Sequence, residues 1–178
     1  MNTIASLIRL HPEKAEHAVE ALADLFRASF SDKKLITLGE ELALCRDYLH
    51  IEQLRFDKRL TVVWDLDQLP EDALIPPLCL QPLLENAIYY GIHALPAGGS
   101  IRVQGRLRGK WIQLQIENPL GETQVLHQGH QIAQNNIYQR LKVCYGQQAQ
   151  FTRVQDQDRY QVNLSFPYWN QFHENSYR

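Results

Sequence analysis

The sequence predicts an α+β sandwich, in which helices cover one face of a single sheet. Strand-like segments come in pairs joined by short turns, and long helical segments separate these pairs along the chain. The length of 178 residues and the apolar content of 44% suit one domain with a sizeable core, with or without a small appendage.

The first helical segments form a predicted helical hairpin. Residues 2–10 make a short helix, and Pro12 suits the first turn of the next one. From Ala15 to Phe30, apolar residues recur at alternating spacings of three and four, which gives this helix one apolar stripe. Such hairpins often pair with a second copy in a four-helix bundle, so we expect a homodimer. The alternative is that the hairpin packs only against its own domain.

Helix and strand signals alternate in the next part of the chain. Thr37 and Glu40 form a predicted capping box at the start of a helix that runs to about Phe56. Residues 60–66 are rich in β-branched side chains and predict a strand. After the Pro76–Pro77 pair, apolar residues with helical spacing predict a buried stripe, which is formed by Leu80, Leu83, Leu84, Ala87 and Ile88.

Two β-hairpins are predicted in the second half of the chain. The first joins residues 101–107 to 110–118, and the second joins residues 149–156 to 159–166. Between the hairpins, residues 119–130 carry no period and form a loop long enough to suggest a functional lid. The helix that follows this loop ends at Gly146, a typical residue at a helix C-terminus.

Charge and cysteine content narrow the function classes. A net charge of -2 with 21% charged residues argues against a general nucleic-acid binder, which would usually be basic. The three cysteines are far apart and have no CxxC spacing, so we expect reduced thiols rather than disulfides or a zinc site. The apolar runs are too short to span a membrane, and the N-terminus lacks a signal-peptide pattern. The chain as given is therefore expected to be cytoplasmic.

Two adjacent polar residues, Glu85 and Asn86, interrupt the Leu-rich helix. Helical geometry places Asn86 at the edge of the buried stripe, with Tyr90 and His93 above it at i+4 and i+7. Glu85 falls on the polar face. An exposed polar pair at the rim of the domain is the plainer interpretation of these two residues alone.

A glycine before a helix adds a second signal. Gly129 leaves backbone N–H groups free at the start of the last helix, where the helix dipole favours an anion, although it could equally be an ordinary loop glycine. His127 and His130 form an HxxH pair in the same loop. A metal site there would need further ligands, so a solvated pair is the simpler interpretation.

The motifs together resemble a known family. "PLLENAIYYGI" is similar to the N-box, and "GHQIAQNNIYQRL" to the second glycine box, of LytS-type sensor histidine kinases. Residues 2–30 resemble the segment that follows the phosphoacceptor histidine, and "LGEELALCRDYLHIEQLRFDKRLTVVWDL" resembles the connecting helix and first strand. The resemblance covers about residues 2–166 and is strongest to the branch tied to alginate and pilus regulation.

This resemblance implies a Bergerat (GHKL) fold that binds ATP and Mg²⁺. Asn86 would give its amide oxygen to Mg²⁺, which needs few protein ligands. Glu85 would accept or orient the proton of the attacking nucleophile. Tyr90 stands where the family often has histidine, and it counts among the nucleotide-binding candidates.

Four further candidates come from the second half of the chain. Asn118 matches the position that accepts a hydrogen bond from the adenine amino group, and an Asn oxygen can accept the same bond. Gly129 and the adjacent His130 belong to the glycine box near the phosphates. Arg140 is a candidate for phosphate contact. Two departures concern the glycine boxes: Gly121 is the only glycine near the first box, and Gln131 replaces a glycine of the second.

The implied organisation has three parts: a remnant of the dimerisation and phosphoacceptor region at residues 1–34, the ATP-binding catalytic domain at 35–168, and a tail at 169–178. The expected function is transfer of the γ-phosphoryl of ATP to a histidine upstream of residue 1, and then to a response regulator. The regulator is expected to be of the LytTR type, and the whole protein is expected to have an inner-membrane anchor. The alternative is a degenerate nucleotide-binding fold that acts as a dimeric scaffold for a regulator. A third possibility, an unrelated enzyme, has no Ser/His/Asp or Cys/His signature to support it.

Overall fold

The computed structural model describes residues 33–121 and 128–170, together with a few positions between 12 and 23; for residues 128–132 it describes the backbone alone. The predicted helical hairpin, most of the predicted lid and most of the C-terminal tail therefore lie outside the described residues. The predicted division at residues 34 and 168 remains a prediction.

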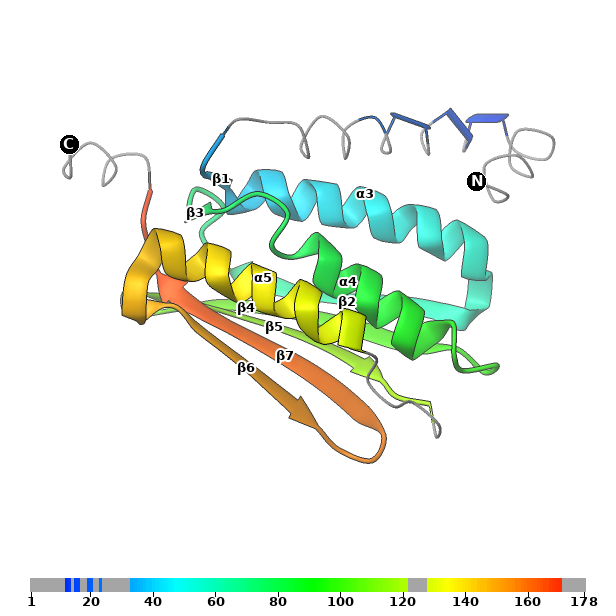
Figure 1. Ribbon diagram of the computed structural model, residues 1–178. Helices are drawn as coiled ribbons and strands as arrows, with labels where there is room; N and C mark the ends of the chain where they lie inside the picture. Colours follow the sequence, from blue (N-terminus) through cyan, green and yellow to red (C-terminus); the bar gives the residue numbers. More distant parts are fainter. Residues whose placement is uncertain are drawn as a thin grey trace.

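A five-stranded mixed sheet forms one layer of the domain (Figure 1). Its strands are β2 (Leu60–Gln68), β4 (Gly99–Arg108), β5 (Trp111–Pro119), β7 (Arg159–Pro167) and β6 (Gln150–Gln155), in that spatial order. Strands β2 and β4 are parallel, and the other neighbours are antiparallel. A parallel pair needs a long crossover, and this crossover carries the helix with Glu85 and Asn86.

Helices cover one face of this sheet, as predicted (Figure 1). They are α3 (Leu38–Phe56), the short α4 (Gln81–Asn86), the π-helix η2 (Ala87–Ile92) that continues it, and α5 (Gln128–Tyr145). Alternate strand residues face these helices and form the core, which includes Ile101, Val103, Ile112, Leu114, Ile116, Val162, Leu164 and Phe166. The α+β class and both predicted hairpins are confirmed, and a mixed sheet with helices on one face is the arrangement expected of a GHKL-type fold.

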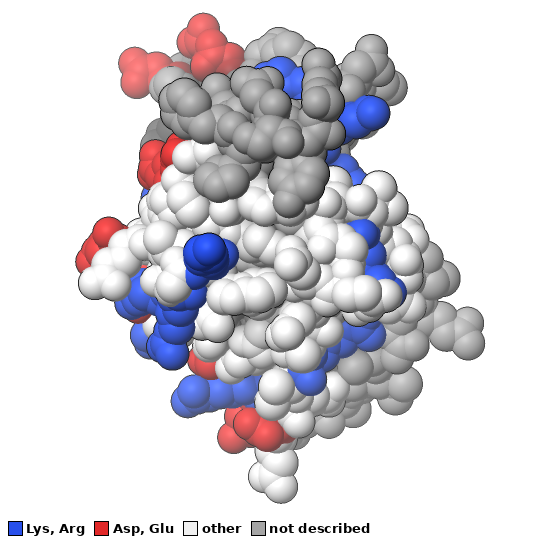
Figure 2. All heavy atoms as spheres, turned by 90° about the vertical axis from the view of Figure 1, so that its left-hand side faces the viewer, with Lys and Arg blue, Asp and Glu red and all other residues white. Residues whose placement is uncertain are grey.

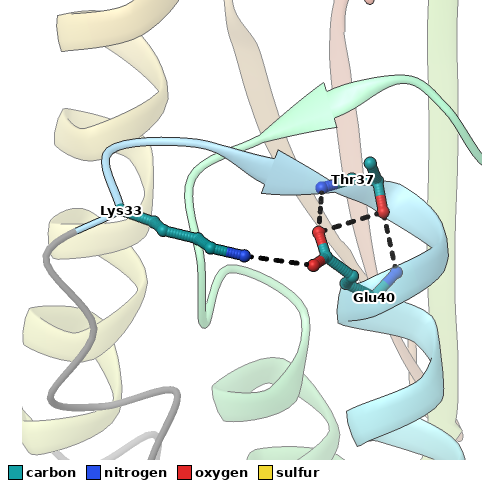
Figure 3. Close-up of polar contacts among 3 residues, drawn as sticks. All are labelled: Lys33, Thr37 and Glu40. Atoms are coloured by element: carbon teal, nitrogen blue, oxygen red, sulfur yellow. Dashed lines mark hydrogen bonds and ion pairs between the residues drawn. The ribbon is translucent and has the colours of Figure 1, made fainter. Parts of the chain in front are cut away.

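The start of α3 is fixed by the predicted capping box (Figure 3). The backbone N–H of Thr37 donates to the Glu40 carboxylate over 2.7 Å, and the backbone N–H of Glu40 donates to Thr37 Oγ1 over 3.1 Å. Lys33 adds an exposed ion pair to the same carboxylate at 3.3 Å. The helix ends at Phe56, where the sequence pattern predicted its end.

A small second sheet escaped the sequence pattern. Its strands β1 (Ile36–Thr37) and β3 (Leu74–Ile75) are only two residues long, so they show no alternation. The 3₁₀ turns η1 (Asp57–Arg59) and η3 (Gly146–Gln148) follow α3 and α5. The small sheet ties the start of α3 to the segment that leads into α4.

Charges on the face in Figure 2 are dispersed. Lys and Arg lie in separate groups around a largely uncharged area, with Asp and Glu among them.

In the part of the chain that the structure describes, no helix is long and apolar enough to cross a membrane. Cys45, Cys79 and Cys144 are all free thiols, as expected from their spacing.

Candidate functional site

The helix with Glu85 and Asn86 is built in two parts. All five residues of its predicted stripe are buried, which confirms the predicted helical face. The sequence predicts a helix after the Pro76–Pro77 pair, and the structure has one there, but it is not α-helical throughout. The α-helical part begins only at Gln81, and after Asn86 the backbone widens into a π-turn, in which the N–H of His93 donates to the carbonyl of Ile88 over 2.8 Å. Such π-turns occur frequently at functional sites.

A buried carboxylate holds the start of this helix. Glu41 of α3 is fully buried, and its two oxygens accept hydrogen bonds from the backbone N–H groups of Leu78, Leu80 and Gln81 at 2.7, 2.8 and 3.4 Å. Burial raises the pKa of Glu41, while these N–H donors favour its charged form and pull the pKa back down. Glu41 therefore fixes where α4 begins relative to α3.

Arg140 of α5 holds the same segment from the other side. Its guanidinium donates to the carbonyl oxygens of Pro77 and Leu78, the latter over 3.3 Å. Leu78 has a φ of 57°, an uncommon left-handed conformation for a non-glycine residue, and it lies between these two anchors. Arg140 is thus committed to backbone carbonyls and does not line the cleft around Asn86. Its predicted phosphate contact remains a prediction.

The predicted polar residues of the helix line one cleft of about 380 Å³. From α4 and η2 the cleft is lined by Glu85, Asn86, Ile88, Tyr89 and Tyr90, with His93 just beyond. From α3 it is lined by Tyr48 and Arg55. The cleft has the size of a small-ligand site and combines aromatic, carboxylate, carboxamide and cationic groups.

Asn86 and Glu85 differ in how they are held. The Nδ2 atom of Asn86 is buried and has no hydrogen-bond partner among the described residues. Buried polar groups are normally paired, so this amide is prepared for a ligand or water. Glu85 is exposed, and its Oε1 accepts a hydrogen bond from Gln81 Nε2 over 2.9 Å, which orients the carboxylate. The exposure of Glu85 confirms its predicted place on the polar face.

Aromatic rings line the outer wall of the cleft. Tyr89 is exposed and meets Tyr90 edge to face, with ring centroids 4.9 Å apart. Its ring also stacks against that of His93 at 6.0 Å. Tyr89 and Tyr90 belong to η2 and His93 follows it directly, so the three rings lie close together at this end of the helix.

Three α3 residues around the cleft were missed by the sequence reasoning. Tyr48, Glu52 and Arg55 lie at i, i+4 and i+7, so they share one helix face. Glu52 is 9% exposed and forms an ion pair with Arg55 at 3.0 Å. Burial raises the pKa of Glu52, and Arg55 opposes this shift. Burial also raises the pKa of the Tyr48 hydroxyl, and the nearby Glu52 adds to the effect. The sequence signal that could have revealed these residues is Glu52, a glutamate on the otherwise apolar face of α3.

Asn118 lies next to the helix but outside this cleft. It is 4% exposed at the end of β5, and its Nδ2 donates to the carbonyl of Pro119 over 2.8 Å. The amide oxygen is not used in this bond. Gly91 of η2 lies directly against it, because a Cβ at that position would be 2.8 Å from the Asn118 Nδ2.

The glycine-box residues are described only by their backbone. Gly129 and His130 lie in the first turn of α5, which begins at Gln128, so the prediction that both lie in the loop before this helix was wrong. His127 and the rest of the predicted lid lie outside the described residues. The predicted roles of these residues therefore remain predictions.

Comparisons with known proteins agree with this architecture. A family model described as "Histidine kinase" matches residues 1–60. The sensor histidine kinase BtsS of Escherichia coli K12 is 29% identical over 170 residues, which cover 94% of this chain and 30% of that protein. The sensor protein LytS of Staphylococcus saprophyticus is 31% identical and covers 96% of this chain and 31% of that protein. The chain thus spans about a third of the length of these curated relatives.

Solved structures support the fold. The catalytic domain of the histidine kinase ThkA superposes with a TM-score of 0.55 at 10% identity, covering 75% of this chain and 94% of that one. At this identity the likeness concerns the fold alone. It agrees with the mixed sheet and its one-sided helical layer.

Proposed function

Because the chain belongs to the LytS-type sensor histidine kinases, we propose that its domain binds Mg-ATP in the cleft beside Asn86. The γ-phosphoryl then passes to the phosphoacceptor histidine, which the family resemblance puts upstream of residue 1. The observation that carries this proposal is the cleft itself, which brings Glu85, Asn86 and Tyr90 together beside a cation. The branch tied to alginate and pilus regulation remains a prediction.

The residues of the cleft fit a magnesium ion that is held largely by nucleotide. Mg²⁺ prefers hard oxygen ligands, keeps several waters and commonly takes only one or two protein ligands beside phosphate oxygens. The carboxamide of Asn86 offers one such oxygen, and its unpaired amide leaves its orientation free to adjust. When bound, Mg²⁺ would neutralise phosphate charge.

The remaining roles follow from the side chains. Glu85 is exposed at the mouth of the cleft, where its carboxylate can orient or deprotonate an incoming histidine. Asn118, at the end of β5, has an amide oxygen that can accept a hydrogen bond from adenine. Gly129 and His130 at the start of α5 would approach the phosphates through backbone N–H groups.

Partners belong to the same proposal. The resemblance implies a response regulator of the LytTR type as phosphoryl acceptor. The apolar stripe from Ala15 to Phe30 implies a homodimer. An inner-membrane anchor in the whole protein is a further implication of the resemblance.

A scaffold without kinase activity is the second candidate. Gln131 stands where the family has glycine, and a Cβ there hinders close approach of the backbone to phosphate. Gly121 is the only glycine near the first glycine box. These two positions favour a fold that binds nucleotide weakly or not at all. Such a fold would signal to a regulator through a conformational change.

Calorimetry with ATP and Mg²⁺ separates the two candidates. The kinase proposal expects saturable binding at micromolar to millimolar nucleotide and, with the phosphoacceptor region present, an acid-labile phosphohistidine. Absence of binding at millimolar ATP would reject the kinase proposal and favour the scaffold.

A further inference from the structure

The cleft beside Asn86 contains a cation that comes from a different element. Arg55, in the last turn of α3, lines the cleft together with Glu85 and Asn86. Its guanidinium lies over the Phe56 ring, 4.6 Å from the centroid, which limits the directions it can take. An arginine binds phosphate through charge-assisted hydrogen bonds, and a carboxamide oxygen can be a ligand of Mg²⁺ that is bound to phosphate, so the two side chains suit a metal-bound phosphate chain.

Other arginines near this helix are engaged elsewhere. Arg140 donates to the carbonyls of Pro77 and Leu78, and Arg59 donates to the carbonyl of Leu95 over 2.8 Å. Neither residue lines the cleft. Arg55 is the arginine among the described lining residues, and its side chain is 39% exposed and therefore reachable by a ligand.

Glu52 holds Arg55 in the structure. The Nη1 atom of Arg55 donates to both Glu52 oxygens, at 3.0 and 3.4 Å. A guanidinium has five N–H donors, so Glu52 engages only part of its capacity. A triphosphate carries more charge than one carboxylate, and it can compete for Arg55 when it enters the cleft.

We propose that Arg55 binds the terminal phosphates of the nucleotide and that Glu52 holds it in place before the nucleotide arrives. This inference rests on the proposed function, because it assigns a residue to the same cleft. It makes Arg55, rather than Arg140, the side chain that distinguishes a triphosphate from a monophosphate. It also makes Glu52 a competitor that lowers nucleotide affinity.

Equilibrium binding to the full chain tests this role without any activity measurement. Calorimetric titrations with ATP and ADP in Mg²⁺, and with AMP, compare the wild type with Arg55→Gln and Arg55→Ala. Arg55→Gln should weaken ATP binding about tenfold or more and leave AMP binding nearly unchanged, because only the terminal phosphates lose a charge-assisted partner. Arg46→Gln is the matched control. Arg46 also lies on α3, but its guanidinium is 5.3 Å from the Trp64 ring centroid and it does not line the cleft.

Glu52→Gln should change the affinity for ATP in the opposite direction to Arg55→Gln. This variant keeps the side-chain shape, removes the competing charge and should bind ATP several-fold more tightly than the wild type. Two outcomes would overturn this inference but leave the proposed function intact, provided that the wild type binds ATP. In the first, Arg55→Gln binds ATP as tightly as the wild type does. In the second, Arg55→Gln loses affinity for ATP and for AMP to the same extent. Unchanged or weaker ATP binding by Glu52→Gln would overturn the role of Glu52. A wild type that binds no ATP would instead refute the proposed function.

Discussion

Gly91 and Asn118 are in such close contact that no side chain fits between them. A Cβ on Gly91 would lie 2.8 Å from the Nδ2 of Asn118 and 2.9 Å from the carbonyl oxygen of Pro119. The two residues belong to the two motifs proposed to hold the metal-phosphate and adenine ends of a nucleotide. Their contact sets the spacing between the π-helix η2 and the end of β5.

Substitution of Gly91 by alanine should therefore disturb both motifs together. We expect Gly91→Ala to lower the free energy of unfolding by about 1–3 kcal/mol, since backbone and a buried amide must shift to admit the methyl group. Urea unfolding measures this loss. Gly121→Ala is the control, because its Cβ would meet the Cβ of Ala94 at an ordinary 3.5 Å. Equal stability of the two variants would contradict the close-packing argument.

The strongly patterned parts of the fold were predictable from sequence. The capping box at Thr37 and Glu40, the buried stripe on α4 and η2, and both hairpins carry short-range signals, and the structure confirms them. The π-turn after Asn86 was not predictable, because a single π-turn is too short to leave a period of its own in the apolar pattern. The strands β1 and β3 are too short to show alternation.

Only the part of the candidate site that lies on one helix was predictable from the sequence. Glu85, Asn86 and Tyr90 form a local motif, so one helix brings them together. Arg55, which is paired with Glu52, reaches the cleft from α3, about 30 positions earlier, through tertiary packing rather than through a local motif. Asn118, at the end of β5, lies against Gly91 of the same helix but outside the cleft, so the sequence motifs alone did not show that the two predicted halves of the site are separate.

The carboxylate of Glu41 should matter more for stability than an exposed one. Glu41→Gln replaces one acceptor oxygen with an NH₂ group that faces a backbone N–H, so we expect a loss of about 2–4 kcal/mol. Glu71→Gln, at an exposed position, should change stability by about 0.5 kcal/mol or less. Chemical unfolding of both variants is the measurement. A loss of similar size in both would show that the three N–H bonds to Glu41 contribute little.

The capping box gives a smaller and more local prediction. Thr37→Ala removes the acceptor for the Glu40 N–H and should cost about 1 kcal/mol. Lys33→Ala removes only an exposed ion pair and should cost on the order of 0–1 kcal/mol, less than the cap. Thermal or urea unfolding ranks the two variants. A greater loss for Lys33→Ala would contradict the assignment of the cap.

The raised pKa of Glu52 predicts that the stability of the folded protein depends on pH. Its pKa is raised in the folded protein above the ordinary value of 4.5, so the folded state holds this proton to higher pH than the unfolded state does. The stabilising contribution of the proton is complete below 4.5 and is lost as pH rises through the folded pKa. Glu52→Gln cannot lose this proton. Its stability relative to the wild type should therefore increase from pH 4 to neutrality, as measured by unfolding at each pH. A decrease over this range would mean that the Arg55 ion pair outweighs burial.

The most direct test of the central claim is the Mg²⁺ dependence of ATP binding by the wild type and Asn86→Ala, measured by calorimetry. The two proteins should be compared with and without Mg²⁺, after circular dichroism has shown that both are folded. We expect Mg²⁺ to strengthen ATP binding to the wild type and to have little effect on Asn86→Ala, because the carboxamide that lines the cleft supplies the metal ligand. An unchanged Mg²⁺ response in Asn86→Ala would contradict the assignment of this cleft as the Mg-ATP site.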